Sequence, residues 1–171
     1  DTLYDAPHYG LTIKDCWLRR RDNTFELKIR PPHIGEQRMC VYEEIANEAE
    51  IRNRLSLPTK VSLADDLLSM EYEILVTITT HRRTYTKGPF TMVFDGATYK
   101  GSDLTHTLCE IERMVANPSH VQAAQQEIFA FAAAHGLDIT KNVHGKGVVY
   151  IKHKRPAHFR ALVKAGVVLD T

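Results

Sequence analysis

The 171-residue sequence has few of the residues that form disulfide crosslinks in small domains or bind structural metals. Its three cysteines, Cys16, Cys40 and Cys109, are odd in number and far apart, and none belongs to a CxxC pair. A disulfide framework and a zinc knuckle are therefore not expected, and a reducing compartment is the default. The nine histidines show no HxxxH-type spacing, so we expect no zinc site.

Long apolar runs and a strong net charge are also absent. No stretch approaches the roughly 20 apolar residues that a membrane span needs, and no signal peptide is visible. A net charge of +1 gives no overall electrostatic attraction for nucleic acid. Any anion site therefore has to come from local clustering of basic residues. We therefore expect a cytoplasmic protein that binds neither membranes nor nucleic acid.

Internal repeats and Gly/Ser-rich linkers are missing as well, which predicts a single domain over residues 1–171. The chain begins with Asp1 rather than Met, so we expect natural residues upstream of it. Short runs rich in β-branched and aromatic residues dominate the first two thirds and predict antiparallel strands. These runs are Asp1–Asp5, Trp17–Arg21, Thr24–Ile29, Met39–Ile45, Glu71–Thr80, Phe90–Phe94 and Leu108–Met114.

Helix signals lie between and after these strands. Asn47 and Glu50 form a capping box, so a helix is expected from there to about Leu55. A second helix is expected between the N-cap Asn117 and Gly136, because apolar residues recur on one of its faces. The other expected elements are a short apolar turn at Ser62–Leu68, a strand at Val148–Lys152 and a helix at Ala157–Lys164.

Charged residues recur at i and i+2 on several expected strands, which places them on one strand face. These sets are Trp17 with Arg19 and Arg21, Glu26 with Lys28, Tyr42 with Glu44, Thr80 with Arg82, and Glu110 with Glu112. One interpretation is that they form the solvent faces of half-buried strands. The other is a barrel whose polar interior holds a polar ligand, which the separation of cations and acids onto different strands favours.

In the barrel interpretation, the residue types suit a polyphosphate with a bound metal ion. Cationic side chains donate hydrogen bonds to phosphate oxygens, and an arginine guanidinium can donate two parallel ones. Carboxylates hold a hard divalent cation that bridges to the same oxygens. The cations are Arg19, Arg21, Lys28 and Arg82, and the carboxylates are Glu110, Glu112 and Asp95.

Five motifs along the chain resemble, in order, those of CYTH domains, the triphosphate tunnel family. The first three are Asp1-Thr-Leu-Tyr-Asp-Ala-Pro, Trp17-Leu-Arg-Arg-Arg-Asp and Glu26-Leu-Lys. Cys109-Glu-Ile-Glu resembles the family's acidic E-x-E strand. The tail, Lys146-Gly-Val-Val-Tyr-Ile followed by Arg155-Pro-Ala-His-Phe-Arg-Ala-Leu, is similar to the thiamine triphosphatase branch of the family.

This resemblance implies an α+β fold, in which an eight-stranded antiparallel barrel with flanking helices binds a triphosphate and Mg²⁺ inside. The family's first strand carries an acidic-x-acidic-x-Lys motif that has no counterpart here, so we expect the barrel to lack that strand. The implied activity is Mg²⁺-dependent hydrolysis of the terminal phosphoanhydride of thiamine triphosphate. The complete protein is expected to be a monomer.

Site residues follow from the resemblance position by position. The phosphate-binding cations of the family correspond to Arg19, Arg21, Lys28, Arg82 and Lys146. Its metal-binding acids correspond to Glu110 and Glu112, and further tunnel acids correspond to Asp95 and Glu44. In the family Lys28 also assists catalysis, and Trp17 matches the aromatic that stacks on thiamine, as suits a cation over an indole. A core aromatic is the alternative interpretation of Trp17.

Two positions depart from the thiamine triphosphatase pattern. Leu3 stands where that branch has a tyrosine that works with the catalytic lysine, and Val93 replaces an acid two residues before Asp95. Inorganic triphosphatase is therefore an alternative, as is a catalytically weak CYTH-like domain that serves as a binding or structural subunit. Class IV adenylyl cyclase is a third alternative, which the C-terminal motif disfavours.

Overall fold

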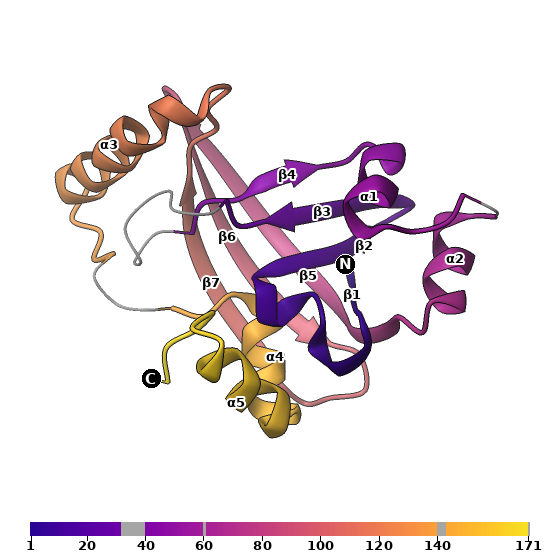
Figure 1. Cartoon of the computed structure of the whole chain (residues 1–171). Helices are drawn as coiled ribbons and strands as arrows, with labels where there is room; N and C mark the ends of the chain where they lie inside the picture. The colour runs from indigo at the N-terminus through magenta and orange to yellow at the C-terminus, as the bar shows by residue number, and fades with distance from the viewer. Residues whose placement is uncertain (32–39, 60, 140–142, 171) are drawn as a thin grey trace.

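The computed structural model describes residues 1–31, 40–59, 61–139 and 143–170. In these ranges seven strands form one antiparallel sheet, in the order β4-β3-β2-β1-β5-β6-β7 (Figure 1). The strands are β1 (Thr2–Asp5), β2 (Cys16–Arg21), β3 (Thr24–Ile29), β4 (Glu43–Ile45), β5 (Glu73–Lys87), β6 (Phe90–Tyr99) and β7 (Thr105–Glu112). The α-helices are α1 (Glu48–Leu55), α2 (Leu63–Ser69), α3 (Val121–Ala134), α4 (Lys146–Lys154) and α5 (Pro156–Lys164). Short 3₁₀ helices are η1 (Pro7–Tyr9), η2 (Thr12–Lys14) and η3 (Pro118–His120).

A tight turn fixes the register of the β2–β3 hairpin. Asp22 in that turn has a φ of 51°, the left-handed conformation that two-residue hairpin turns require. The register places Arg19 opposite Glu26 and Trp17 opposite Lys28, so these four side chains share one face of the sheet. The expected antiparallel pairing and the shared face are both confirmed.

The strands β5 to β7 differ in length and position from the predictions. The expected strands Glu71–Thr80 and Phe90–Phe94 end too early. Strand β5 continues to Lys87 at the turn around Gly88, and β6 stays paired with it as far as Tyr99, opposite Ile78. The expected strand Leu108–Met114 lies too far along the chain, because β7 pairs with β6 from Thr105 onward. Backbone pairing along a neighbouring strand outweighs the weak strand propensity of polar residues there.

Strand β4 is shorter than its prediction of Met39–Ile45. Met39 lies outside the described residues, residues 40–42 are not in a strand, and the strand spans Glu43–Ile45. The strand pairs with β3 and places Glu44 opposite Lys28. This pairing extends the face that carries the β2–β3 charges.

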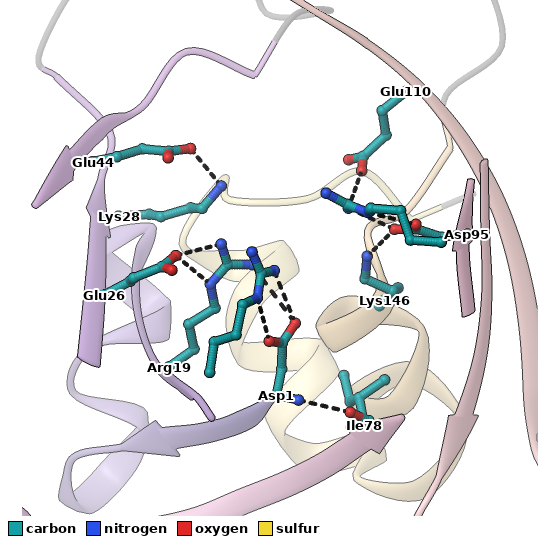
Figure 2. Close-up of polar contacts among 11 residues, drawn as sticks. Asp1, Arg19, Glu26, Lys28, Glu44, Ile78, Asp95, Glu110 and Lys146 are labelled. Atoms are coloured by element: carbon teal, nitrogen blue, oxygen red, sulfur yellow. Dashed lines mark hydrogen bonds and ion pairs between the residues drawn. The ribbon is translucent and has the colours of Figure 1, made fainter. Parts of the chain in front are cut away.

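Two apolar clusters flank the curled sheet on opposite sides. Helices α1 and α2 cover the outer face of β1–β4, where Leu18 and Leu27 pack with Ile51 and Leu67. Helices α4 and α5 close one end of the inner face, where Ile78 and its neighbours pack with residues of both helices. Figure 2 shows charged side chains from several strands on the rest of the inner face.

Helix α3 lies over the far end of the β5–β6 hairpin (Figure 1). Asn117 caps η3 rather than α3, because the first turn of the predicted helix is 3₁₀. The rings of Phe131 and Phe90 are 4.4 Å apart, which fixes α3 against β6. The predicted apolar face is confirmed, since all its members are buried: Val121, Ala124, Ile128, Phe131 and Ala132.

The expected strand Val148–Lys152 is wrong, because this segment lies inside α4. Its β-branched residues favour a strand locally, but Val148 and Ile151 are spaced to lie on one helical face. Both are buried against the sheet, and this tertiary packing outweighs local propensity. The expected turn Ser62–Leu68 is likewise a helix, α2, whose N-cap Ser62 accepts a hydrogen bond from the Asp65 N–H.

Among the helices in the described part of the chain, none is long and apolar enough to cross a membrane.

Candidate functional site

The inner face of the sheet brings together charged side chains from the six strands β2 to β7 and from Asp1, which directly precedes β1. Figure 2 shows several of them facing one another. We divide it into two walls that point toward each other across the curled sheet. The β1–β4 wall consists of Asp1, Arg19, Arg21, Glu26, Lys28 and Glu44. The β5–β7 wall consists of Arg82, Asp95, Glu110 and Glu112, and Lys146 reaches it from the first residue of α4.

Cross-strand ion pairs organise the β1–β4 wall. Arg19 donates to the Glu26 carboxylate from Nε at 2.8 Å and from Nη2 at 2.5 Å. Arg21 makes a forked contact with Asp1, at 2.8 and 3.2 Å. The strands therefore do not keep cations and acids apart: neighbouring strands mix the two signs, contrary to the sequence interpretation.

Lys28 and Glu44 form the outermost pair of this wall. The Lys28 Nζ lies 2.6 Å from the Glu44 Oε1, and their side chains are 26% and 43% exposed. Because water reaches both groups, the ion pair is weak. An anion of higher charge can therefore displace the Glu44 carboxylate from Lys28. Lys28 is therefore placed to exchange its carboxylate partner for a phosphate.

Asp95 is the centre of the β5–β7 wall. Arg82 donates to both of its carboxylate oxygens at 2.7 Å, and the Lys146 ammonium donates to Oδ2. Burial disfavours ionisation of Asp95, but the hydrogen bonds from Arg82 and Lys146 outweigh it and lower its pKa to about 2. The wall thus holds two cations in fixed positions around one ionised carboxylate.

The predicted metal-binding acids are only partly gathered. Glu110 lies 3.8 Å from Arg82 beside Asp95, and Glu112 is on the same face of β7, two residues further along. Glu44 is on the opposite wall with Lys28. In the described ranges, no three His, Cys, Asp or Glu residues are close enough to form a ready metal cage.

This arrangement nevertheless fits magnesium. Mg²⁺ is usually held by one or two carboxylates, several waters and substrate phosphates rather than by an all-protein cage. Glu110 and Glu112 are partly or fully open to solvent and project from the same face of β7. They can supply those carboxylates, whereas Asp95 is already committed to two cations.

Trp17 is held at one end of the β1–β4 wall by Asp15. Its indole N–H donates to the Asp15 carboxylate at 2.8 Å. Arg30 and Tyr42 donate to the same carboxylate at 2.9 and 2.8 Å. Burial raises the pKa of Tyr42 well above its usual range, and the Asp15 charge adds to this effect, so the phenol remains a donor.

Sequence reasoning missed this Asp15 cluster. One available signal was the spacing of Arg30, which follows Lys28 at i+2 and therefore shares its strand face. The contribution of Asp15 had no such signal, because it precedes β2 and adopts a left-handed φ of 53°. That turn aims the carboxylate back at the indole.

Leu3 and Gly147 pack against the other side of the indole. A Cβ atom at Gly147 would lie 2.9 Å from the Leu3 Cδ2 and 3.2 Å from the Trp17 Cζ3. A larger residue at this position in α4 would therefore push against both side chains. The predicted stacking residue is thus partly enclosed by the core.

The CYTH domain family model matches residues 1–143, which include all seven strands and α3. A thiamine-triphosphatase of Macaca fascicularis is 25% identical over 179 residues, covering 96% of this chain and 76% of that protein. Among solved structures, a Bacillus halodurans protein provisionally named an adenylate cyclase is 14% identical, with a TM-score of 0.46. The match covers 90% of this chain and 80% of that chain.

Proposed function

This chain belongs to the CYTH domain family, and on that premise we propose that its inner face binds a triphosphate and hydrolyses the terminal phosphoanhydride. Thiamine triphosphate is the substrate that we favour, because the macaque relative is a thiamine-triphosphatase. The observation that carries the proposal is the set of five cations on two facing walls. They are Arg19, Arg21, Lys28, Arg82 and Lys146. Figure 2 labels Arg19, Lys28 and Lys146.

Triphosphate binding is an exchange of partners in this arrangement. Each of the five cations has a carboxylate partner, so no unpaired positive charge has to be stored in the free protein. A triphosphate offers more negative charge and more acceptor oxygens than any one of these carboxylates. The forked guanidinium groups of the arginines match phosphate oxygens in geometry as well as in charge.

Lys28 is the residue that we propose for leaving-group stabilisation. Its ammonium lies on the inner face between Trp17 on β2 and Glu44 on β4, in register with both. In the free protein its Nζ donates to the Glu44 Oε1 at 2.6 Å. A charged ammonium can donate a proton or a hydrogen bond to the oxygen that departs from the terminal phosphorus.

Glu110 and Glu112 are the residues that we propose to hold Mg²⁺. The ion, when bound, would offset phosphate charge and help to orient the terminal phosphoryl group. Asp95 would act beside them by holding Arg82 and Lys146 toward the substrate. Arg82 and Lys146 then stabilise the charge that develops on the transferred group.

Inorganic triphosphate is a second candidate substrate, and the environment of Trp17 favours it. The indole is tied to Asp15 by its N–H and packs against Leu3 and Gly147, so it leaves less free ring surface for stacking. A triphosphate without an organic group needs no such surface. The two walls would bind its oxygens in the same way.

Phosphate release tests these substrates directly in the full-length protein that carries this sequence. We expect Mg²⁺-dependent release from thiamine triphosphate, weaker release from tripolyphosphate and little from ATP. Lys28→Ala should lower the rate while leaving the melting temperature nearly unchanged, and Lys164→Ala, an exposed change on α5, serves as the matched control. Absence of release from all three compounds, together with no rise in melting temperature on adding tripolyphosphate, would overturn the proposal.

A further inference from the structure

A buried polar relay connects α5 to the start of the sheet, outside the two walls. It consists of Asp5 at the end of β1, Thr12 in η2 and His158 in α5, which are 0%, 1% and 1% exposed. The Thr12 hydroxyl lies 2.6 Å from the Asp5 Oδ2 and 2.6 Å from the His158 Nε2. The phosphate-binding role proposed above uses none of these groups.

The hydrogen-bond partners fix the direction of this relay. The Asp5 Oδ1 accepts from the backbone N–H groups of Ala6, Leu11 and Thr12, and its Oδ2 accepts from the Thr12 hydroxyl. A hydroxyl has one proton, so its oxygen must accept from the His158 Nε2–H. The Nε2 of His158 therefore carries a proton, and its Nδ1 is a buried nitrogen that has no hydrogen-bond partner among the described residues.

The imidazole is enclosed on its faces as well. The Tyr9 ring stacks on it at 3.9 Å with an interplanar angle of 6°. Desolvation by burial lowers the pKa of His158, against the opposing effect of Asp5, and this keeps the ring neutral near pH 7. An apolar side chain of similar size would fill this space without leaving a polar atom unsatisfied. The polar relay therefore provides a directional restraint that packing alone would not.

The restraint acts on the helix pair that carries Lys146. Helix α5 follows α4 after a single residue, Arg155, and Ile151 of α4 and Leu162 of α5 are fully buried in one cluster. Lys146 begins α4, its carbonyl accepts from the Tyr99 hydroxyl at 2.9 Å, and its ammonium reaches Asp95. A shift of α5 along the sheet would therefore move the Lys146 ammonium relative to the β5–β7 wall.

We propose that His158 is a positioning residue for triphosphate binding. Through Thr12 and Asp5 it fastens the α4–α5 pair to the β1–β2 connection, and this fixes the Lys146 ammonium against the β5–β7 wall. The inference rests on the proposed function, because it assigns Lys146 to phosphate binding. A side chain at position 158 that donates a hydrogen bond to Thr12 keeps Lys146 in position. Loss of the Thr12 hydroxyl removes this restraint on Lys146.

The test measures tripolyphosphate affinity by calorimetry in a double-mutant cycle. Thr12→Val keeps the side-chain shape and removes both relay bonds, and we expect it to weaken binding by about two- to tenfold. His158→Gln retains an amide donor near the Nε2 position and should bind within about twofold of wild type. In a Lys146→Ala background, Thr12→Val should weaken binding no further, because its effect passes through Lys146.

A matched control separates positioning from loss of stability. Ile51→Val trims a fully buried residue in the cluster on the outer face, so it lowers the melting temperature and should leave tripolyphosphate affinity unchanged. Wild-type affinity in Thr12→Val would overturn the positioning role, as would an equal loss in the presence and absence of Lys146. Failure of the wild-type protein to bind tripolyphosphate would instead refute the proposed function, and the positioning role with it.

Discussion

The two walls of the inner face contain similar charged side chains, but the ion pairs of the two walls differ in how far they are exposed to water. On the β5–β7 wall, Arg82 and Lys146 share Asp95, whose side chain is 1% exposed. On the β1–β4 wall, Arg19 pairs with Glu26, and both side chains are about a fifth exposed, at 18% and 22%. On that wall the Asp1 carboxylate is 8% exposed, but its partner Arg21 is 38% exposed. One wall is therefore built around a fully buried carboxylate that two cations share, and the other around pairs in which water reaches at least one partner.

This difference indicates how a triphosphate would enter. Separating the Lys28–Glu44 pair exposes both groups to water, which costs little, because solvent-exposed pairs contribute about 0–1 kcal/mol. Separating Asp95 from its cations would leave a buried charge without compensation, which costs several kcal/mol. We therefore expect the β5–β7 wall to keep its geometry on binding and the β1–β4 wall to rearrange its ion pairs.

Removing the acids of the β5–β7 wall should have the largest effect on activity. In the double variant Glu110→Gln and Glu112→Gln, we expect Mg²⁺-dependent hydrolysis to fall by about 100-fold or more, because changes even to outer-shell partners of metal ligands cost 10–100-fold. Circular dichroism should show an intact fold, since both residues lie on an edge strand and neither is buried.

Two Glu→Gln substitutions on the β1–β4 wall are the control for this comparison. Glu26→Gln with Glu44→Gln removes as much negative charge from the β1–β4 wall, and it removes the nearest carboxylate partners of Arg19 and Lys28. Hydrolysis should then fall much less, or tripolyphosphate should bind more tightly. Equal losses in the two double variants would mean that the walls do not differ in metal binding.

Much of the inner face could be predicted from the sequence, because it depends on the two-residue period of strands. The alternation in Trp17–Arg21 and in Glu110–Glu112 places those charges correctly on one face of each strand. The partners across the β2–β3 hairpin were also predictable, because the two-residue loop between the predicted strands sets Arg19 opposite Glu26. The pairing of β3 with β4 was not, because no short turn joins these strands and nothing in the sequence alone sets Lys28 opposite Glu44.

Two further features were beyond sequence reasoning for physical reasons. Helix α4 has the β-branched composition of a strand, and packing of Val148 and Ile151 against the sheet decides its conformation. The relay from Asp5 to His158 joins residues at opposite ends of the chain. Long-range contacts of this kind leave no periodic signal in the sequence.

Acid should weaken the β5–β7 wall in a defined pH window. The pKa of Asp95 is lowered from 3.8 to about 2, so between these values the unfolded chain binds a proton that the folded chain does not. The stabilisation is therefore complete above about pH 4 and is lost as the pH falls toward 2. This loss amounts to about 2 kcal/mol for a shift of this size.

Urea unfolding between pH 5 and pH 2 measures this contribution. The wild-type protein should lose about 2 kcal/mol more than Asp95→Asn over the window, since other carboxylates titrate alike in both. Lys146→Met keeps Asp95 but removes one of its two cations, so it should shift the loss to higher pH. Parallel pH profiles in all three proteins would contradict the assignment of Asp95 as the centre of this wall.

Removing one arginine from each wall should show the same contrast at neutral pH. Arg82→Met leaves the buried Asp95 with Lys146 as its remaining partner, and we expect it to lower the free energy of unfolding by about 1–3 kcal/mol. Arg19→Met leaves Glu26 accessible to water, so its cost should be about 1 kcal/mol or less. A larger cost for Arg19→Met would reverse the comparison.

The smallest expected effect concerns the organic end of the substrate, which the β1–β4 wall would contact through Trp17. Trp17→Ala should weaken thiamine triphosphate binding by about 0.5–2 kcal/mol, the range for a cation over an aromatic face, and leave tripolyphosphate nearly unchanged. Because the indole also packs against Leu3 and Gly147, the variant loses stability for reasons unrelated to the ligand. Trp17→Phe distinguishes the two contributions, since it keeps a ring and loses the N–H that Asp15 accepts. Trp17→Phe should retain much of the difference between the two ligands, whereas Trp17→Ala should abolish it. If both variants weaken the two ligands equally, the ring contributes to the core alone, and the preference for thiamine triphosphate over inorganic triphosphate does not come from this wall.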